Sequence, residues 1–325
     1  MASAGPPGST GRPPRVTEFF AGKKILITGG AGFIGSFVVE HLVTARGVDP
    51  ADIVVPRSRD CDLRELEHAR RAVKGCQIVF HLAAQTGGIA FSRSHPASQY
   101  YNCALINLMT LEAARQEGVE RFVGVANLLA YPAAAPSPLR EEHVHDGAIA
   151  STHLGIGLSK RDLVDMGEMY HREFGMNVTV MLPANAYGPR DRFDPAISHV
   201  IPATIRKCFH EPELVVWGDG SPTRDFLYVE DLAAGLVLAA ERLEGSQCVN
   251  LASGQEISIR DLVHLIARLT GYAGRVSFDA SKSGGDPRRA ASTERADRLV
   301  GLKPRYTLEE GLRRTIDWYR QVGAP

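Results

Sequence analysis

The stretch KILITGGAGFIGS, residues 24–36, decides the fold of this chain. It starts as an apolar strand, continues through a turn rich in glycine, and opens a helix with apolar residues at helical spacing. Gly29 permits the tight turn, Gly32 lets the backbone approach a pyrophosphate, and Gly35 allows the helix to pack closely on the sheet. The amides of the first helical turn face the phosphates. The stretch therefore predicts a dinucleotide-binding turn.

Apolar segments of strand type alternate with helical patterns after this turn. We expect strands at 52–55, 78–82, 122–126 and 178–182, and helices at 33–46, 63–73, 99–116 and 158–174. This alternation predicts an α/β fold of Rossmann type, a doubly wound parallel sheet with helices on both faces. Gly and Pro become frequent from about Asn185, which predicts a smaller C-terminal substrate lobe. We expect a disordered tail at 1–20, a dinucleotide-binding domain at 21–185, and at 186–325 mainly the substrate lobe, with some elements returning to the first domain.

The composition bears on the kind of partner. Lys plus Arg and Asp plus Glu both number 37 in 325 residues, so no overall field favours nucleic acid or a membrane surface. The five cysteines include no CxxC pair, which favours reduced thiols over a disulfide framework or a zinc site. No stretch resembles an export signal or a membrane span. We therefore expect a cytoplasmic protein with a small-molecule partner, no nucleic acid and no membrane.

The end of the second expected strand indicates which nicotinamide nucleotide binds. An acidic residue there accepts hydrogen bonds from the free ribose hydroxyls, whereas an arginine accommodates a 2′-phosphate. Residues 54–59 read VVPRSR and place Arg57 where the acid would stand. We therefore predict NADP, with NAD as the alternative if the arginines here are only solvated loop residues. Asp62 and Leu63 are placed to bound the adenine, and HLAA at 81–84 to pass under the pyrophosphate and the nicotinamide ribose.

Motifs in both halves of the chain carry a family resemblance. They are TGGAGFIG at 28–35, HLAAQTGGI at 81–89, NAYGP at 185–189, SHVIP at 198–202, WGDGSPTRDF at 217–226 and FDASK at 278–282. From about Lys23 onward the sequence resembles the extended short-chain dehydrogenase/reductase superfamily, and within it the GDP-L-fucose synthases. That resemblance implies an NADP-dependent epimerase-reductase for a nucleotide-linked sugar, its nucleotide GDP.

The resemblance also implies roles for the residues that match the family's motifs. Lys160 would anchor the nicotinamide ribose as part of the catalytic set, and His199 would be the epimerisation acid. The implied cofactor contacts are Gly29, Gly32, Phe33, Ile34, Gly35, Arg57, Asp62, Leu63, Leu82, Ala83, Ala84, Lys160, Pro183 and His199. The implied substrate contacts are Asn185, Lys207, Trp217, Arg224 and Lys282. Among them Asn185 and Arg224 would hold the diphosphate, because a guanidinium fork matches phosphate oxygens.

Three positions depart from the family's catalytic pattern. The family uses Tyr-x-x-x-Lys, in which the tyrosine passes a proton to or from the reacting oxygen. Lys160 is present, but Ile156 stands four residues earlier and can neither donate nor accept a proton. Asn127 replaces the partner Ser or Thr, and Leu129 replaces a cysteine of the epimerisation step. The nearest polar substitutes are Asn127 itself and His153, each of which can equally be structural.

Several functions therefore stay open. One is an NADP-binding nucleotide-sugar epimerase/oxidoreductase with rewired proton transfers, since Lys160, His199, Asn185 and Arg224 are all retained. Another is a catalytically silent NADP(H)-binding homologue that acts as a partner or regulatory subunit. A third is an enzyme repurposed for a proton transfer without redox chemistry. A metal site is not expected, because the histidines and aspartate of 143–153 lack a tight ligand pattern.

The resemblance further implies a homodimer that pairs the two long helices at 99–116 and 158–174. Candidate residues of that apolar face are Ala104, Leu108, Leu111, Leu163 and Met169. The same residues would fit the core of a monomer, so the pattern leaves both arrangements open.

Overall fold

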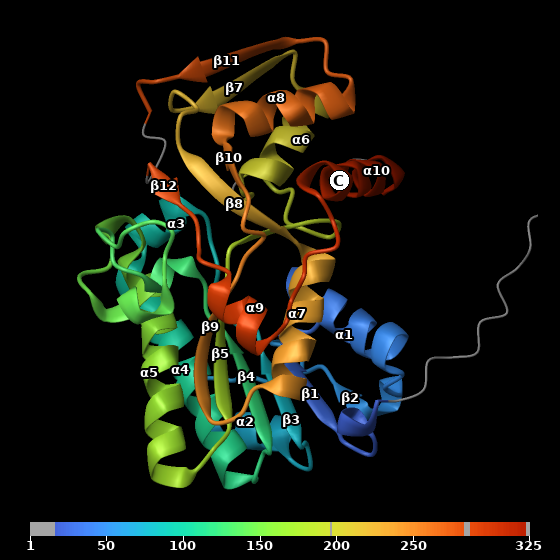
Figure 1. Cartoon of the computed structure of the whole chain (residues 1–325), viewed down its shortest axis with the longest axis vertical. Coiled ribbons are helices and arrows are strands. Elements are labelled where there is room, and N and C mark those ends of the chain that lie inside the picture. Colours follow the sequence, from blue (N-terminus) through green and yellow to red (C-terminus); the bar gives the residue numbers. More distant parts are fainter. Residues whose placement is uncertain (1–16, 196, 283–286, 323–325) are drawn as a thin grey trace, which may run out of the picture.

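The computed structural model describes residues 17–195, 197–282 and 287–322, which form a larger and a smaller lobe (Figure 1). The larger lobe contains a six-stranded sheet in the order β2-β1-β3-β4-β5-β9. Its strands are β1 (Ile25–Thr28), β2 (Ile53–Val54), β3 (Ile78–His81), β4 (Arg121–Val125), β5 (Val178–Pro183) and β9 (Ser246–Leu251). All neighbouring strands are parallel. The predicted doubly wound parallel sheet of Rossmann type is confirmed.

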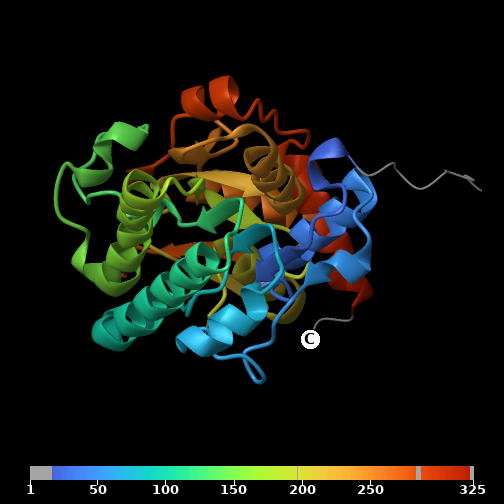
Figure 2. The same ribbon diagram turned by 90° about the horizontal axis from the view of Figure 1, so that it is seen from below.

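Helices cover both faces of this sheet. On one face α1 (Phe33–Arg46) packs against α7 (Val229–Arg242). On the other face α4 (Pro96–Gln116) lies between α2 (Leu66–Val73) and α5 (Leu154–Phe174). Figure 2 shows blue α1 and green α5 at opposite sides of the molecule. Strands buried in this way need apolar side chains toward both layers, which explains the continuous apolar runs in the sequence.

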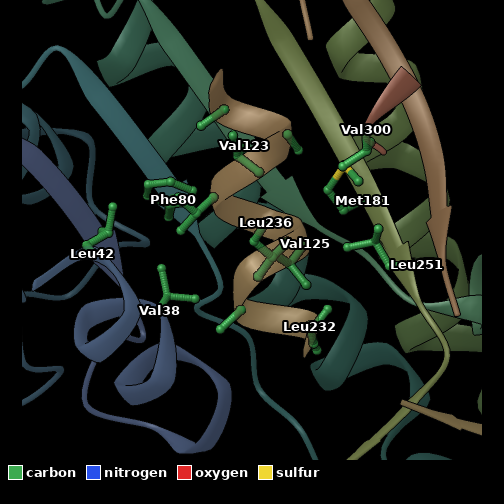
Figure 3. Close-up of a cluster of buried hydrophobic side chains, with 14 of the residues drawn as sticks. Val38, Leu42, Phe80, Val123, Val125, Met181, Leu232, Leu236, Leu251 and Val300 are labelled. Carbon is green, nitrogen blue, oxygen red and sulfur yellow. The ribbon is translucent and has the colours of Figure 1, made fainter. Parts of the chain in front are cut away.

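The core between the sheet and α7 is continuous (Figure 3). Leu232 and Leu236 of α7 are fully buried, in one cluster with Val38 and Leu42 of α1 and with side chains of the central strands such as Val123. Because α7 and β9 follow the first elements of the smaller lobe in the sequence, the chain crosses between the lobes more than once.

The smaller lobe surrounds a separate core of aromatic and aliphatic side chains. Its helices are α6 (Val200–His210), α8 (Ile259–Thr270) and α10 (Leu308–Gln321). Its strands are β6 (Asn185–Tyr187), β7 (Glu213–Trp217), β8 (Thr223–Tyr228), β10 (Glu256–Ser258), β11 (Arg275–Asp279) and β12 (Arg288–Arg289). Strand β8 pairs with β6, β10 and β12, whereas β7 and β11 form a separate parallel pair at the top of Figure 1.

Short elements complete the described chain. They are η1 (Glu18–Phe20), η2 (Pro50–Asp52), α3 (Ile89–Ser94), η3 (Leu128–Ala130), η4 (Glu141–His145), η5 (Ser151–His153) and α9 (Glu294–Leu299). Among the helices of the described ranges, none is both long and apolar enough to cross a bilayer.

Several expected boundaries differ from the structure. The helices expected at 63–73 and 99–116 begin at Leu66 and Pro96, and the strand expected at 52–55 covers only Ile53–Val54. The helix expected at 158–174 begins earlier, at Leu154. The sequence did not indicate this start, because glycine at position 155 is unfavourable for a helix. In the structure a Cβ on Gly155 would collide with the carbonyl oxygen of Pro96. Of the tail expected at 1–20, residues 1–16 lie outside the described residues. Its last residues are ordered, since Glu18–Phe20 form a turn and Phe20 is buried in the core of the larger lobe.

Candidate active site

The turn between β1 and α1 has the geometry that its glycines predict. Gly29 has a φ of 70°, and a Cβ there would lie 3.1 Å from the backbone of Leu82 and Ala83. A Cβ on Gly35 would collide with the carbonyl oxygen of Gly29. A larger residue at either position would therefore force the turn away from its neighbours.

Gly32 is the N-cap of α1 and marks the open side of the turn. A Cβ on Gly32 would have only the Gly29 carbonyl oxygen within 4 Å, at 3.1 Å. The amides of Phe33 and Ile34 follow directly, and a helix leaves its first amides without an intrahelical acceptor. Open space in front of free amides is the arrangement that binds phosphate.

Thr28, the last residue of β1, fastens the end of β3 beside this turn. Its hydroxyl oxygen accepts hydrogen bonds from the amides of Leu82, at 3.1 Å, and Ala83, at 3.2 Å. It also lies 3.0 Å from Nδ1 of His81, whose Nε2 is 3.1 Å from Oδ1 of Asn107. Burial lowers the pKa of His81 to about 4, so this histidine is neutral at pH 7. The segment that runs on to Ala84 is thereby held at the carboxyl edge of the sheet.

Arg57 is exposed in the loop after β2 and is available to a ligand. Within the described ranges its guanidinium has no hydrogen bond or ion pair, whereas Arg59 is paired with Asp60 at 3.0 Å. Asp62 is already engaged, because hydrogen bonds from Arg64 lower the pKa of its carboxyl to about 2. The neighbouring Leu63 is buried.

Lys160 projects from α5 to the carboxyl end of β4. Its ammonium donates a hydrogen bond to the carbonyl oxygen of Val125 at 2.7 Å, and burial lowers its pKa. One turn earlier in α5 lies Ile156, which is 4% exposed. Asn127 follows β4 as the N-cap of η3, where its Oδ1 accepts from the amide of Leu129 at 3.0 Å. The lysine therefore lies at the carboxyl end of β4, with the hydrocarbon side chain of Ile156 one helical turn earlier.

His153, the other polar substitute named from the sequence, is buried. His153 ends η5 just before α5, and its Nδ1 lies 3.1 Å from the hydroxyl of Thr152. Pro183 is buried at the end of β5, the strand beside β4. The strand ends at Thr28, His81, Val125 and Pro183 thus share one edge of the sheet, the edge at which folds of this class bind ligands.

The expected substrate residues fall into separate groups in the smaller lobe. Asn185 and Arg224 lie on the paired strands β6 and β8, where Nδ2 of Asn185 donates to the carbonyl oxygen of Asp225 at 3.0 Å. Trp217 is 64% exposed, and the ammonium of Lys282 lies 5.0 Å from its ring centroid. Lys207 is tied to the carbonyl oxygen of Val215 at 2.7 Å.

His199 is the N-cap of α6, the first helix of the smaller lobe. Its side chain is open to solvent, yet the surrounding protein, with Arg192 as a second cause, lowers its pKa.

Arg289 is a residue near this site that the sequence did not single out. Its side chain is buried, and Nη2 donates to the carbonyl oxygens of Leu128, at 2.7 Å, and Tyr131, at 3.3 Å. In the β12–β8 pairing Arg289 is the partner of Arg224. It therefore connects strand β8 of the smaller lobe to the η3 loop that follows Asn127. Strand β12 has two residues, too few to show a period in the sequence.

Other features do not converge on this site. A hollow of about 460 Å³, lined in part by Arg115, Phe174 and Asn177, lies at the opposite edge of the sheet, where α4 and α5 end. Across the described part of the chain, no group of three or more His, Cys, Asp or Glu side chains is arranged to hold a metal ion. The candidate site therefore rests on the carboxyl strand ends and the residues around them.

Comparisons with known proteins identify the family of the chain. The family model for the NAD dependent epimerase/dehydratase family matches residues 25–252. The chain is 33% identical over 304 residues to a GDP-L-fucose synthase of Sinorhizobium fredii, covering 91% of this chain and 95% of that protein. It is 34% identical over 316 residues to the GDP-L-fucose synthase of Escherichia coli, covering 91% and 96%.

Solved structures give the same result. A GDP-L-fucose synthetase from Naegleria fowleri superposes with a TM-score of 0.84 at 26% identity, covering 95% of this chain and 96% of that one. UDP-glucose 4-epimerase of Thermotoga maritima, solved with UDP-glucose, superposes with a TM-score of 0.82 at 27% identity, covering 92% and 99%. The glycine turn, the placed lysine and these matches together make the chain a member of the NAD-dependent epimerase/dehydratase family.

Proposed function

We propose that this protein is an NADP-dependent nucleotide-sugar epimerase/oxidoreductase whose proton transfers do not pass through residue 156. Its substrate is a keto sugar linked to a nucleoside diphosphate, and GDP is the nucleotide in the names of its relatives at 33% and 34% identity. The observation that carries the proposal is that both ends of the site are kept. Lys160 stands at the strand ends, and Asn185 and Arg224 stand on paired strands of the smaller lobe.

The cofactor proposal rests on residues that fit a dinucleotide. Gly29, Gly32 and Gly35 leave a cradle that a Cβ would fill, and the amides after Gly32 would hold the pyrophosphate. Arg57 would bind the 2′-phosphate through its guanidinium, since it has no ion-pair partner in the described ranges. Among the structural neighbours, a Naegleria GDP-L-fucose synthetase was solved bound to NADP, at 25% identity and a TM-score of 0.83. When bound, NADPH supplies a hydride to a carbonyl carbon.

The protein's own residues have defined parts in this proposal. Lys160 would hold ribose hydroxyls from its buried position, and the hydrocarbon of Ile156 would exclude water without giving a proton. Oδ1 of Asn127 is occupied by the amide of Leu129, so Nδ2 remains to donate a hydrogen bond to a substrate oxygen. An amide polarises a carbonyl in this way but does not transfer a proton. Reduction of the sugar would therefore draw its proton from water or from another side chain.

A second candidate function is a silent homologue that binds NADP(H) and a nucleotide sugar as a partner or regulatory subunit. It is favoured by the replacement of three reacting positions, at Asn127, Leu129 and Ile156. Both candidates require the same two ligands to bind, so only turnover separates them.

The test incubates the purified protein with NADPH and GDP-4-keto-6-deoxymannose. NADPH absorbance and product identity are followed together, and calorimetry measures the binding of each ligand. We expect both ligands to bind and an epimerised or reduced sugar to form, and a Lys160→Met variant to lose this activity. Binding of both ligands without any product would establish the silent homologue instead.

We also infer a homodimer through α4 and α5. Six of the nine exposed large hydrophobic residues in the described ranges lie on these two helices. They are Tyr100, Tyr101, Leu108, Leu154, Met169 and Phe174. Leu111 and Leu163, expected on the same face, are instead fully buried in the core of one chain. All five cysteines are free thiols, which fits a cytoplasmic location.

A further inference from the structure

The segment 188–192, called the strap below, is fixed to the smaller lobe at both ends. It follows β6, whose last residue, Tyr187, is buried in the core of that lobe. It is followed by Phe193, which is buried in the same core and stacks on Tyr319 with ring centroids 4.5 Å apart. The residues between these two aromatic anchors contact the larger lobe.

Arg190, in the middle of the strap, contacts α1. Its Nη2 donates to Oε2 of Glu40 at 2.7 Å, and its guanidinium carbon lies 4.4 Å from the ring centroid of Phe37. Its Nη1 donates to the hydroxyl oxygen of Ser36 at 3.3 Å, and that hydroxyl donates to the carbonyl oxygen of Phe33, the first residue of α1. The contacts of Arg190 therefore extend to the first turn of the helix whose amides would hold the pyrophosphate.

Arg192 joins the strap to the larger lobe at a second place. Its Nη1 donates to the hydroxyl oxygen of Thr86 at 2.8 Å. Thr86 lies two residues beyond Ala84, in the loop that Thr28 fastens at the carboxyl edge of the sheet. The first turn of α1 and this loop are both expected to contact the cofactor, so the strap connects the smaller lobe to two parts of the cofactor site.

The backbone of Arg190 indicates that arginine is not here to form the turn. Among the described residues, Arg190 is the one non-glycine residue with a positive φ, 66°, a conformation that is costly for a side chain other than glycine. Its ion pair with Glu40 is exposed, at 43% and 49% of the two side chains, and such a pair adds little to the stability of a fold. Glycine would suit the turn better, so the contacts with α1 are what the arginine provides.

We infer that Arg190 is a positioning residue: it sets the spacing between the cofactor site and the smaller lobe, so that a sugar held there by its nucleotide meets the nicotinamide. This inference rests on the proposed function. Asn185, which would hold the diphosphate, lies on β6 just before the strap, and His199 lies beyond its other end, at the start of α6. The nucleotide binds within the smaller lobe, whereas the sugar has to reach the cofactor in the larger one. Loss of Arg190 should therefore weaken the binding of the sugar and not of the nucleotide.

The test measures, by calorimetry, the affinities for GDP and for GDP-mannose, each with and without saturating NADPH. GDP-mannose carries no keto group, so NADPH cannot reduce it during the measurement. In the wild type we expect NADPH to tighten the binding of GDP-mannose by about 5-fold or more, the lower end of the usual coupling between two sites, because the sugar gains the cofactor as a contact. The binding of GDP, which has no sugar to place, should not change.

Arg190→Gly is the first variant, because glycine adopts the φ of this turn without strain. It should keep the wild-type affinities for NADPH and for GDP and a melting temperature close to that of the wild type. The effect of NADPH on GDP-mannose should fall below about 2-fold. Glu40→Gln removes the other partner of the ion pair and should act in the same direction. Exchanging the two residues, Arg190→Glu with Glu40→Arg, should recover part of the effect.

The matched control is Arg46→Gln. Arg46 also lies on α1 and is paired with a glutamate, Glu241, at 2.6 Å, but both residues belong to the larger lobe. This variant should keep the wild-type effect of NADPH on GDP-mannose.

Each adverse outcome has a distinct meaning. An equal effect of NADPH in the wild type, Arg190→Gly and Glu40→Gln overturns the role of Arg190 and leaves the proposed function standing, and so does a wild type that binds NADPH and GDP-mannose independently. Weaker binding of GDP alone by Arg190→Gly, or an equal loss in Arg46→Gln, shows a structural role and also overturns the inference. A wild type that binds NADPH but neither GDP nor GDP-mannose overturns the proposed function together with it.

Discussion

The ammonium of Lys160 lies 2.7 Å from the carbonyl oxygen of Val125, at the carboxyl end of β4. The lysine is thus fixed by the main chain although its expected tyrosine partner is absent. Changing Ile156 to Tyr restores a phenol one helical turn from this ammonium. We expect NADPH oxidation with the keto sugar to rise by about 100-fold or more, the usual contribution of a general acid. Stopped-flow or steady-state absorbance measures it.

The matched control is Ile156→Phe, which adds a ring of similar size without a hydroxyl. It tests for crowding, because residue 156 is buried beside Gly155 and Gly157, two positions without room for a side chain. Equal rates in the Tyr and Phe variants, with both ligands still bound, would show that the position no longer faces the reacting oxygen.

Arg57 should decide between the two nicotinamide nucleotides. Arg57→Ala removes a guanidinium that is available to a 2′-phosphate, and a charge-assisted hydrogen bond is worth about 1.5–3 kcal/mol. We expect NADP to bind about 10-fold to 100-fold more weakly by calorimetry, with NAD binding unchanged. Arg59→Ala is the control, since Arg59 is already paired with Asp60. A loss of both nucleotides in equal measure would contradict the assignment.

The glycine turn should tolerate no side chain at Gly35. A Cβ there would collide with the carbonyl oxygen of Gly29, so Gly35→Ala should displace α1 from the turn. We expect NADP binding to fall below detection in calorimetry and the melting temperature to drop. Gly118→Ala is the control: its φ of 71° strains an alanine and should lower stability, but nothing lies within 4 Å of its Cβ position, so NADP binding should stay unchanged. NADP binding at full affinity by Gly35→Ala would refute a pyrophosphate site here.

His81 should make the protein less stable in acid. The pKa of this buried histidine falls from 6.5 to about 4 on folding, so the unfolded chain binds more protons between these values. The stability is therefore complete above pH 6.5 and is lost as the pH falls toward 4. Urea unfolding at several pH values should show this slope, with His41, whose pKa is also about 4, contributing to it.

Replacing His81 tests this account directly. His81→Phe leaves the buried Thr28 hydroxyl and Asn107 amide without their partner, at a cost of about 1–3 kcal/mol, and should flatten the dependence on pH. The exposed His264 provides the control, and His264→Gln should keep the wild-type slope. A His81→Phe protein with an unchanged slope would remove His81 as its source.

The dimer inferred above depends on exposed apolar side chains of α4 and α5. Met169 is 55% exposed in the single chain, so Met169→Asp should leave the monomer folded. We expect light scattering to give a dimer mass for the wild type and a monomer mass for this variant. A monomeric wild type at micromolar concentration would dismiss the inference.

The sequence allowed the larger lobe to be predicted because its signals are local. An apolar run, a glycine turn and a helix of period 3.6 lie next to one another around Gly29, and alternation then dictates a parallel sheet. The placement of Lys160 followed from its spacing within one helix. Leu111 and Leu163 could not be assigned to core or interface, because a helix shows which residues share a face but not what covers it.

Other parts of the site depend on contacts between distant segments. Arg190 reaches Glu40 of α1 and Arg192 reaches Thr86 after β3, and no local pattern encodes such an arrangement. Arg289 likewise reaches Leu128 from a strand of two residues. A strand so short carries no period, so its pairing with β8 emerges only from the folded chain.

The position of α7 and β9 has a consequence for biosynthesis. The sheet's last strand ends at Leu251, and the leucines that share a core cluster with Val38 and Leu42 of α1 belong to α7. A nascent polypeptide emerging from the ribosome therefore keeps the α1 side of that cluster uncovered until β6, β7 and β8 of the smaller lobe and then α7 have been translated. A fragment that ends at residue 185 would retain the glycine turn but lack α7 and β9, which complete the core of the larger lobe. We expect such a truncated product to precipitate.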